Sequence, residues 1–241
     1  MEICFIGTGH GVPEAGKKCT STLFRVDDNY YLIDAGCDIA YELANKRIPF
    51  EKVKAIFVTH PHTDHTNGLI PFLTVTNWYY TSSDFTIYLP SDQLVTMFRD
   101  PILPGYDQPL QPRQKIERYC EGIVYDDGII KVTAFPTQHC PHSYAFLVEA
   151  EGKRIFFSGD LKRPEIDFPD VNNLDVAILE GAHFSILRYA DVLKDRNIKD
   201  VYINHYGNYI GTINHHNVKP LQEAIAPTTV CLTTDGMEVY V

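Results

Sequence analysis

The sequence predicts a four-layer αββα sandwich of the α/β class, in which two β-sheets pack face to face and helices cover their outer faces. Short apolar, β-branched runs dominate the first third of the 241 residues, and strand-like and helix-like segments alternate after it. This order is typical of two packed sheets with helices outside. No linker, repeat or low-complexity stretch interrupts the pattern, so we expect a single domain over residues 1–241.

The expected elements are short and closely spaced. Strands are expected at residues 3–7, 21–26, 30–34, 54–58, 85–90, 129–135, 143–150, 154–159, 175–180, 200–204, 229–234 and 237–241. Helices are expected at residues 37–46, 67–76, 91–100, 185–197 and 217–225. The segment 101–114 carries five prolines or glycines and is expected to be irregular, as a lid, an interface arm or a plain surface loop.

Composition narrows the choice of partners. The formal net charge is −10 and no long Lys/Arg cluster is present, which argues against extended nucleic-acid binding and leaves room for a small anionic substrate. No apolar run approaches the roughly 18 residues of a membrane span, so no membrane partner is expected. Six scattered cysteines without a CxxC pair or an export signal indicate reduced thiols and a cytoplasmic protein.

The stretch "THPHTDH" at 59–65 gathers three of the ten histidines beside an aspartate, directly after the apolar run "KAIFV". A solvated polar loop would explain the composition but not this spacing. Imidazole and carboxylate groups are the ligands that zinc, manganese and iron use, and a loop at the end of a buried strand is a common place for a site. The stretch therefore predicts a metal site.

Three further polar residues follow apolar strands: His139, Asp160 and His205. Each alone would fit a capped turn or a buried core histidine, but together with the histidine-rich stretch they give five histidines and two aspartates. That set is too large for one tetrahedral zinc and suits two ions bridged by a carboxylate and a hydroxide. Asp160 is the candidate bridge, because a carboxylate can span two ions.

These residues resemble the metallo-β-lactamase superfamily, whose signature is His-x-His-x-Asp-His followed by separate His, Asp and His ligands. "FIGTGHGVP", "YLIDAG", "HCPHSYAF", "FSGD" and "TDGMEV" are also similar to landmarks of its phosphodiesterase branch and appear in the expected order. The resemblance implies one metal site from His60, His62 and His139, a second from Asp64, His65 and His205, and Asp160 as the bridge.

The ligand identities separate the branches of that superfamily. β-Lactamases usually have cysteine where this chain has Asp160, and the diiron redox branch typically has glutamate in place of His62. Two divalent ions, Zn²⁺ or Mn²⁺ rather than iron, are therefore expected. The region "ILEGAHFS" resembles ribonuclease Z and the cyclic phosphodiesterases of phosphonate breakdown, in which a histidine protonates the leaving group. The resemblance implies that role for His183, at the start of a helix, with Glu180 orienting its imidazole.

The expected function is a dinuclear metal-dependent phosphodiesterase for a small nucleotide or sugar-phosphate diester, cyclic diesters included. Hydroxide bridging the ions would attack phosphorus, Asp64 would also orient the nucleophile, and His183 would act as general acid. A lactone or thioester hydrolase, a tRNA 3′-processing endonuclease and a non-catalytic binding module are the alternatives. The long basic arm of ribonuclease Z and the structural-zinc cysteines of the phosphonate-pathway enzyme are missing. The aromatic "NWYY" at 77–80 fits a substrate wall or a homodimer contact equally well.

Overall fold

The computed structural model describes residues 1–99 and 109–241. Most of the expected irregular segment 101–114 therefore lies outside the described residues, and with it the choice between a lid and an interface arm.

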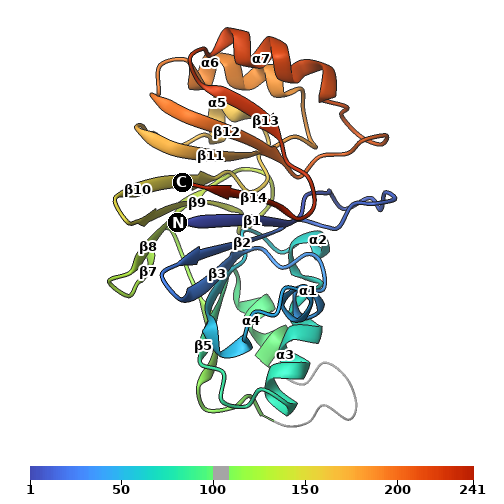
Figure 1. Cartoon of the computed structure of the whole chain (residues 1–241), viewed down its shortest axis with the longest axis vertical. Coiled ribbons are helices and arrows are strands. Elements are labelled where there is room, and N and C mark those ends of the chain that lie inside the picture. Colours follow the sequence, from blue (N-terminus) through green and yellow to red (C-terminus); the bar gives the residue numbers. More distant parts are fainter. Residues whose placement is uncertain (100–108) are drawn as a thin grey trace.

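Two sheets form the centre of the fold (Figure 1). In the described part of the chain the first has the strand order β14-β1-β2-β3-β4-β5-β6 and the second has the order β13-β12-β11-β10-β9-β8-β7. The first sheet consists of β1 (Glu2–Gly7), β2 (Ser21–Val26), β3 (Asn29–Ile33), β4 (Val53–Phe57), β5 (Phe85–Leu89), β6 (Gln114–Arg118) and β14 (Met237–Tyr240). The second consists of β7 (Gly122–Asp126), β8 (Ile130–Pro136), β9 (Tyr144–Ala150), β10 (Lys153–Phe157), β11 (Leu174–Glu180), β12 (Ile198–Asn204) and β13 (Thr229–Leu232).

Short helices cover the outer faces of both sheets (Figure 1). The helices are α1 (Ile39–Asn45), α2 (Thr63–Thr66), α3 (Leu69–Trp78), α4 (Asp92–Arg99), α5 (Pro164–Asp167), α6 (Tyr189–Leu193) and α7 (Val218–Ala224). Helices α1, α3 and α4 pack on the first sheet, and α5, α6 and α7 pack on the second. Three 3₁₀ turns complete the list: η1 (Phe50–Lys52), η2 (Ile186–Arg188) and η3 (His215–Asn217).

The inner faces of the two sheets share an aromatic core. Phe5, Phe24, Phe57 and Phe146 are each no more than 1% exposed, and the rings of Phe57 and Phe146 lie 6.0 Å apart across the two sheets. Alternate side chains of a strand point to opposite faces of its sheet. In the central strands one set of side chains therefore packs between the two sheets, and the other set packs against the helices. The αββα sandwich predicted from the sequence is therefore confirmed.

Three expectations for individual elements were wrong. Strands β6 and β7 were not expected, because "QKIER" is mostly polar and "GIVYD" has only three apolar residues between a glycine and an aspartate; both are edge strands. The helix expected at 185–197 is shorter: Ser185 caps η2 (Ile186–Arg188), and α6 ends at Leu193. Asn197 has a positive φ of 50°, which does not continue a helix.

The direction of the strands brings several of their carboxyl ends to one edge. Strand β3 is parallel to β4, and β10, β11 and β12 are parallel to one another. Strand β8 runs in the same direction as β10, because both pair antiparallel with β9. Tyr144 donates its backbone N–H to the Thr59 carbonyl (3.0 Å), which joins the two sheets at this edge. The loops that follow these strands therefore meet.

Candidate dinuclear metal site

The structure brings all seven predicted ligands together at this edge. His60, His62, His139 and Asp160 each offer a ligand atom, and these atoms all lie within 4.8 Å of one another. Asp64, His65 and His205 form a second group by the same measure. The side chains come from the loops after β4, β8, β10 and β12 and from the short helix α2 that follows the β4 loop, as the parallel strand ends require.

The distances between the ligand atoms of the first group fit a tetrahedrally coordinated ion. His60 Nε2 lies 2.9 Å from His62 Nδ1, which lies 3.2 Å from His139 Nε2. Asp160 Oδ2 is 3.6 Å from the Nε2 atoms of both His60 and His139. Ligands about 2.0–2.1 Å from a tetrahedral zinc are separated from one another by roughly 3.3 Å. These four side chains therefore fit one divalent ion.

The second group has similar spacing. His205 Nε2 is 3.1 Å from Asp64 Oδ2 and 3.3 Å from His65 Nε2, and His65 Nε2 is 3.7 Å from the same carboxylate oxygen. Two imidazoles and one carboxylate facing a common point are a set that divalent zinc or manganese accepts.

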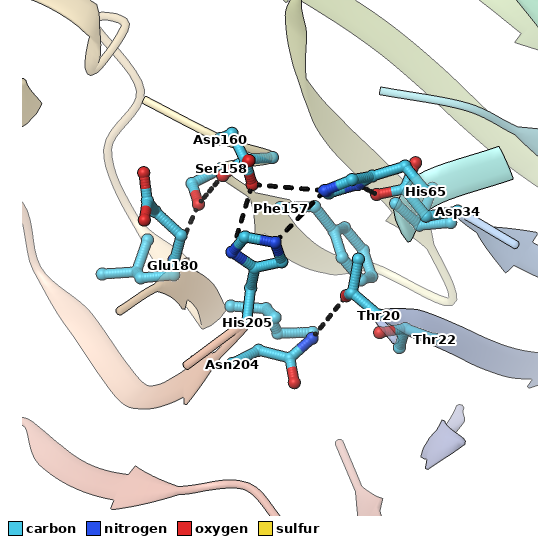
Figure 2. Close-up of a pocket in the computed structure, with 14 residues that line it drawn as sticks. Thr20, Thr22, Asp34, His65, Phe157, Ser158, Asp160, Glu180, Asn204 and His205 are labelled. Atoms are coloured by element: carbon cyan, nitrogen blue, oxygen red, sulfur yellow. Dashed lines mark hydrogen bonds and ion pairs between the residues drawn. The ribbon is translucent and has the colours of Figure 1, made fainter. Parts of the chain in front are cut away.

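Asp160 lies between the two groups. While Oδ2 faces His60 and His139, Oδ1 lies 3.5 Å from His65 Nε2 and 3.4 Å from His205 Nδ1 (Figure 2). The residue is 1% exposed, and Oδ1 has no hydrogen-bond partner among the described residues. A buried carboxylate oxygen without a donor is costly unless a cation compensates it. The geometry supports the predicted bridging role.

Electrostatics favour the metal-binding forms of His60 and Asp160. Burial, reinforced by the positive charge of His65, lowers the pKa of His60, so its imidazole is neutral. Burial alone would raise the pKa of Asp160, but the charges of His205 and His65 hold it well below its usual range. Neutral imidazole and ionised carboxylate are the forms that ligate a metal.

Asp34, at the end of β3, orients one of the ligands and was not singled out from the sequence. Its carboxylate accepts hydrogen bonds from the Thr59 backbone N–H (2.7 Å), the Thr59 hydroxyl (3.0 Å) and His65 Nδ1 (2.7 Å). A carboxylate can only accept, so Asp34 keeps a proton on His65 Nδ1 and the Nε2 side of the ring faces the other ligands. Burial alone would lower the pKa of His65, but Asp34 and Asp160 raise it well above its usual value, so a metal at Nε2 would displace the second proton. The "YLIDAG" segment indicated this residue only through its family resemblance.

Replacing Asp34 with asparagine is expected to weaken metal binding by about 10–100-fold, because one amide oxygen cannot accept from both Thr59 and His65, and an amide NH2 facing His65 Nδ1 would favour the wrong tautomer. Competition with a fluorescent zinc chelator measures the change. Asp127→Asn is the control. Asp127 lies in the β7–β8 turn, and its carboxylate accepts hydrogen bonds from the hydroxyls of Tyr31 and Tyr125. Zinc affinity equal to that of the wild type would contradict the role given to Asp34.

Left-handed backbone conformations shape the strand ends. Asp34, Gly159 and His205 have φ values of 61°, 54° and 48°. At Gly159 a Cβ atom would lie 2.8 Å from the Tyr144 carbonyl oxygen, so glycine satisfies both the conformation and the close approach. Such conformations are uncommon and cluster at functional sites. Here they turn the chain sharply where ligands leave the sheet.

Glu180 and His183 form a dyad at the exposed side of the cluster. His183 Nδ1 donates to Glu180 Oε2 (2.9 Å), and Nε2 lies 3.9 Å from Asp160 Oδ2. Burial alone would lower the pKa of His183, but the hydrogen bond and charge of Glu180 raise it to about 9. The His183 side chain is 38% exposed, whereas that of Glu180 is 1% exposed. The dyad thus presents a protonated Nε2 towards the open side.

One expectation about this residue was wrong. His183 does not open a helix: it lies in a turn after β11, and Ser185 is the N-cap of the 3₁₀ turn that follows. The imidazole is held by Glu180 rather than by a helix end.

Glu14 joins the loop after β1 to the loop after His205, and no sequence pattern indicated this role. Its carboxylate accepts backbone hydrogen bonds from Asn208 (2.7 Å), Tyr209 (3.1 Å) and Ile210 (2.9 Å), and its side chain is 3% exposed. Burial alone would raise the pKa of Glu14, but these donors lower it to about 2.

Replacing Glu14 with glutamine is expected to lower the melting temperature at pH 7 by roughly 2–4 °C, since a charge-assisted acceptor is lost. The pKa of Glu14 is about 2 in the folded protein, against the ordinary value of 4.5 in the unfolded chain. The stabilisation is therefore present above pH 4.5 and is lost as the pH falls through 2. Circular-dichroism melts from pH 2 to 7, with exposed Glu121→Gln as control, measure the difference, and a difference independent of pH would count against this account.

No helix within residues 1–99 and 109–241 has the length and apolarity that crossing a membrane requires.

Several known proteins are similar to this chain. Ribonuclease Z of Oenococcus oeni is 33% identical over 158 residues, which cover 61% of this chain and 48% of that protein. The chain thus spans about half the length of the curated relatives it matches. The metallo-β-lactamase fold protein YhfI from Bacillus subtilis superimposes with a TM-score of 0.81 at 18% identity, over 99% of this chain and 98% of that one. A diphosphatase of the PhnP family gives a TM-score of 0.71 at 15% identity, over 100% and 97% of the two chains.

The structural likenesses confirm the predicted metallo-β-lactamase fold. A family model described as anti-Pycsar protein Apyc1 matches residues 1–185, more than half of the chain. The chain therefore belongs to the anti-Pycsar Apyc1 family.

Proposed function

We propose that the protein is a phosphodiesterase that uses two divalent ions, Zn²⁺ or Mn²⁺, to hydrolyse a small nucleotide-type phosphodiester, with cyclic nucleotides as the first candidates. The observation that carries the proposal is the Glu180–His183 dyad beside the metal-ligand cluster, with Nε2 of His183 3.9 Å from the Asp160 carboxylate. Ions bound by the seven ligands would supply a hydroxide nucleophile near neutral pH and neutralise charge on the phosphoryl oxygens.

The residues of the chain account for the remaining steps. The cluster is open at His62 and His183, which are exposed, and closed at His60, His65 and Asp160, which are buried. A diester therefore approaches from the open side, with its leaving oxygen towards His183. The proton on Nε2 passes to that oxygen as the P–O bond breaks, and Glu180 stabilises the imidazole during the exchange. An alkoxide needs such a proton donor because it is a poor leaving group.

The negative charge of the chain favours a small substrate over a long polyanion. The formal net charge is −10, so an extended nucleic acid would be repelled except at the ligand cluster itself. A small diester can be held by the two ions and His183 alone.

Hydrolysis assays with the metal-loaded protein test the proposal. The panel is the 3′,5′-cyclic and 2′,3′-cyclic nucleotides of the four bases together with bis(p-nitrophenyl) phosphate, each assayed with Zn²⁺, with Mn²⁺ and with a chelator. Metal-dependent release of nucleoside monophosphate is the expected result. No turnover of any phosphodiester, with hydrolysis of a lactone or thioester instead, would replace the proposal by a different hydrolase.

Processing of tRNA 3′ ends is the second candidate, favoured by the 33% identity to a protein named ribonuclease Z. A precursor tRNA with a 3′ trailer, included in the same assays, distinguishes the two functions. Cleavage of the trailer at rates above those for the cyclic nucleotides would make this second candidate the better one.

A further inference from the structure

A buried asparagine holds the loop that carries His183. Asn214 is 0% exposed, and its Nδ2 donates to the carbonyl oxygens of Gly181 (2.8 Å) and Phe184 (3.0 Å). Its Oδ1 accepts the backbone N–H of Ile186 (3.0 Å). These three hydrogen bonds attach to the chain on both sides of His183, which leaves its backbone little freedom.

Glu180 holds the same turn at its inner side. Its Oε2 accepts the backbone N–H groups of Ala182 (3.1 Å) and His183 (3.0 Å) as well as the imidazole Nδ1. The backbone of residues 181–186 is thus fixed by two buried side chains, one at the end of β11 and one 34 positions further along the chain. The His183 imidazole alone reaches the open side of the site.

The loop that supplies Asn214 is itself anchored to the metal-ligand cluster. It begins after the ligand His205, and Glu14 accepts three of its backbone N–H groups. At Gly11, near Glu14 in the first loop, an added Cβ atom would lie 3.1 Å from the carboxylate of the ligand Asp64. One connected set of contacts therefore runs from the second ligand group to the His183 turn.

We propose that Asn214 is a positioning residue for proton donation by His183, and this inference rests on the phosphodiesterase function proposed above. A proton donor acts only when it is held within hydrogen-bond reach of the leaving oxygen, and a displacement of about 1 Å can cost about 10²-fold in rate. The side-chain hydrogen bonds of Asn214 go to Gly181, Phe184, Ile186 and Asn217, and not to any of the seven ligands or to the His183 imidazole. Its loss should affect only the step that needs the His183 proton.

The test compares two leaving groups in Asn214→Ala. Bis(p-nitrophenyl) phosphate expels a weakly basic phenolate that leaves without protonation, whereas a 3′,5′-cyclic nucleotide expels an alkoxide. The kcat for the cyclic nucleotide is expected to fall by about 10–100-fold, and that for the aryl ester by no more than about threefold. The control is Asn77→Ala, a buried asparagine that accepts the Gln111 backbone N–H (3.1 Å) on the outer face of the other sheet.

A double variant separates positioning from general damage. In the His183→Ala background, Asn214→Ala is expected to cause no further loss with the cyclic nucleotide, because there is no longer a donor to position. Equal losses with both substrates, or additive losses in the double variant, would overturn the inference. If Asn214→Ala does not fold, Asn214→Asp replaces it, since it keeps the volume and the acceptor for Ile186 but loses the two donated bonds.

Hydrogen–deuterium exchange gives a readout that does not depend on turnover. The amides of residues 182–186 are expected to exchange faster in Asn214→Ala, while those of residues 59–66 are unchanged. Unchanged exchange at 182–186 would overturn the positioning role. A wild-type protein that hydrolyses neither substrate would instead refute the proposed function, and the exchange result would still decide whether Asn214 holds the turn.

Discussion

Asparagine in place of Asp160 is expected to lower kcat/KM for phosphodiesters by about a thousandfold or more and to reduce the bound metal to one ion or fewer per chain. The two carboxylate oxygens face different ligand groups: Oδ2 lies 3.6 Å from His60 Nε2, and Oδ1 lies 3.5 Å from His65 Nε2. An asparagine has one carbonyl oxygen and no charge, so it can serve one group only. Its shape matches aspartate, so the change creates no cavity.

Metal content and thermal melting measure the consequence of this substitution. Excess zinc should raise the melting temperature of the wild-type protein, because ions bind the folded state preferentially, and the rise should be smaller in the variant. Asp127→Asn is the matched control, since it also removes a hydrogen-bonded carboxylate but lies in the β7–β8 turn. A variant that retains two ions and a tenth or more of the activity would show that Asp160 does not bridge.

The ligand cluster could be predicted from the sequence because each ligand stands beside an easily recognised strand. His60, His139, Asp160 and His205 each follow an apolar run, and strands that run in the same direction in layered sheets end at the same edge. The ligand chemistry of these residues and their positions at strand ends therefore predict the same site. The pairing of particular ligands into two groups, in contrast, came from the superfamily resemblance, and the distances of the structure agree with it.

The supporting residues could not be predicted in the same way. Asp34 lies 31 positions from His65, and Glu14 lies 194 positions from Asn208, so nothing local marks either contact. Asn214 and Glu14 bind mainly backbone N–H and C=O groups, which every residue type provides. A contact with a backbone group places no requirement on the partner's identity, and so it leaves no pattern in the sequence.

The missed strands have a different cause. Both β6 and β7 lie at the edge of a sheet. Strand β6 exposes Lys115, Glu117 and Arg118, as edge strands that resist pairing with other chains usually do, whereas β7 exposes Ile123. Their pattern resembles that of loops. They form strands because β6 pairs with β5 and β7 pairs with β8.

Alanine in place of His183 is expected to make the reaction sensitive to the basicity of the leaving group. In a series of methyl aryl phosphates, the loss of kcat should be small for nitrophenol and rise to about 10²–10⁴-fold for unsubstituted phenol and for alkyl leaving groups. The reason is that only a basic oxygen needs the proton that His183 Nε2 donates while Glu180 holds Nδ1 at 2.9 Å. His216→Ala, at an exposed histidine away from the cluster, should leave the whole series unchanged.

Metal content decides between this role and the alternative that the geometry allows. His183 offers a ligand atom within 4.8 Å of those of Asp160 and His205, so it could also act as a metal ligand. A ligand's loss would lower metal content and depress every substrate equally, whatever its leaving group. A proton donor's loss leaves the metal in place and separates the substrates by leaving-group basicity, because the barrier rises only where negative charge accumulates on the departing oxygen. Full metal content with a steep dependence on the leaving group would therefore establish His183 as the acid, and uniform loss with reduced metal would make it a ligand.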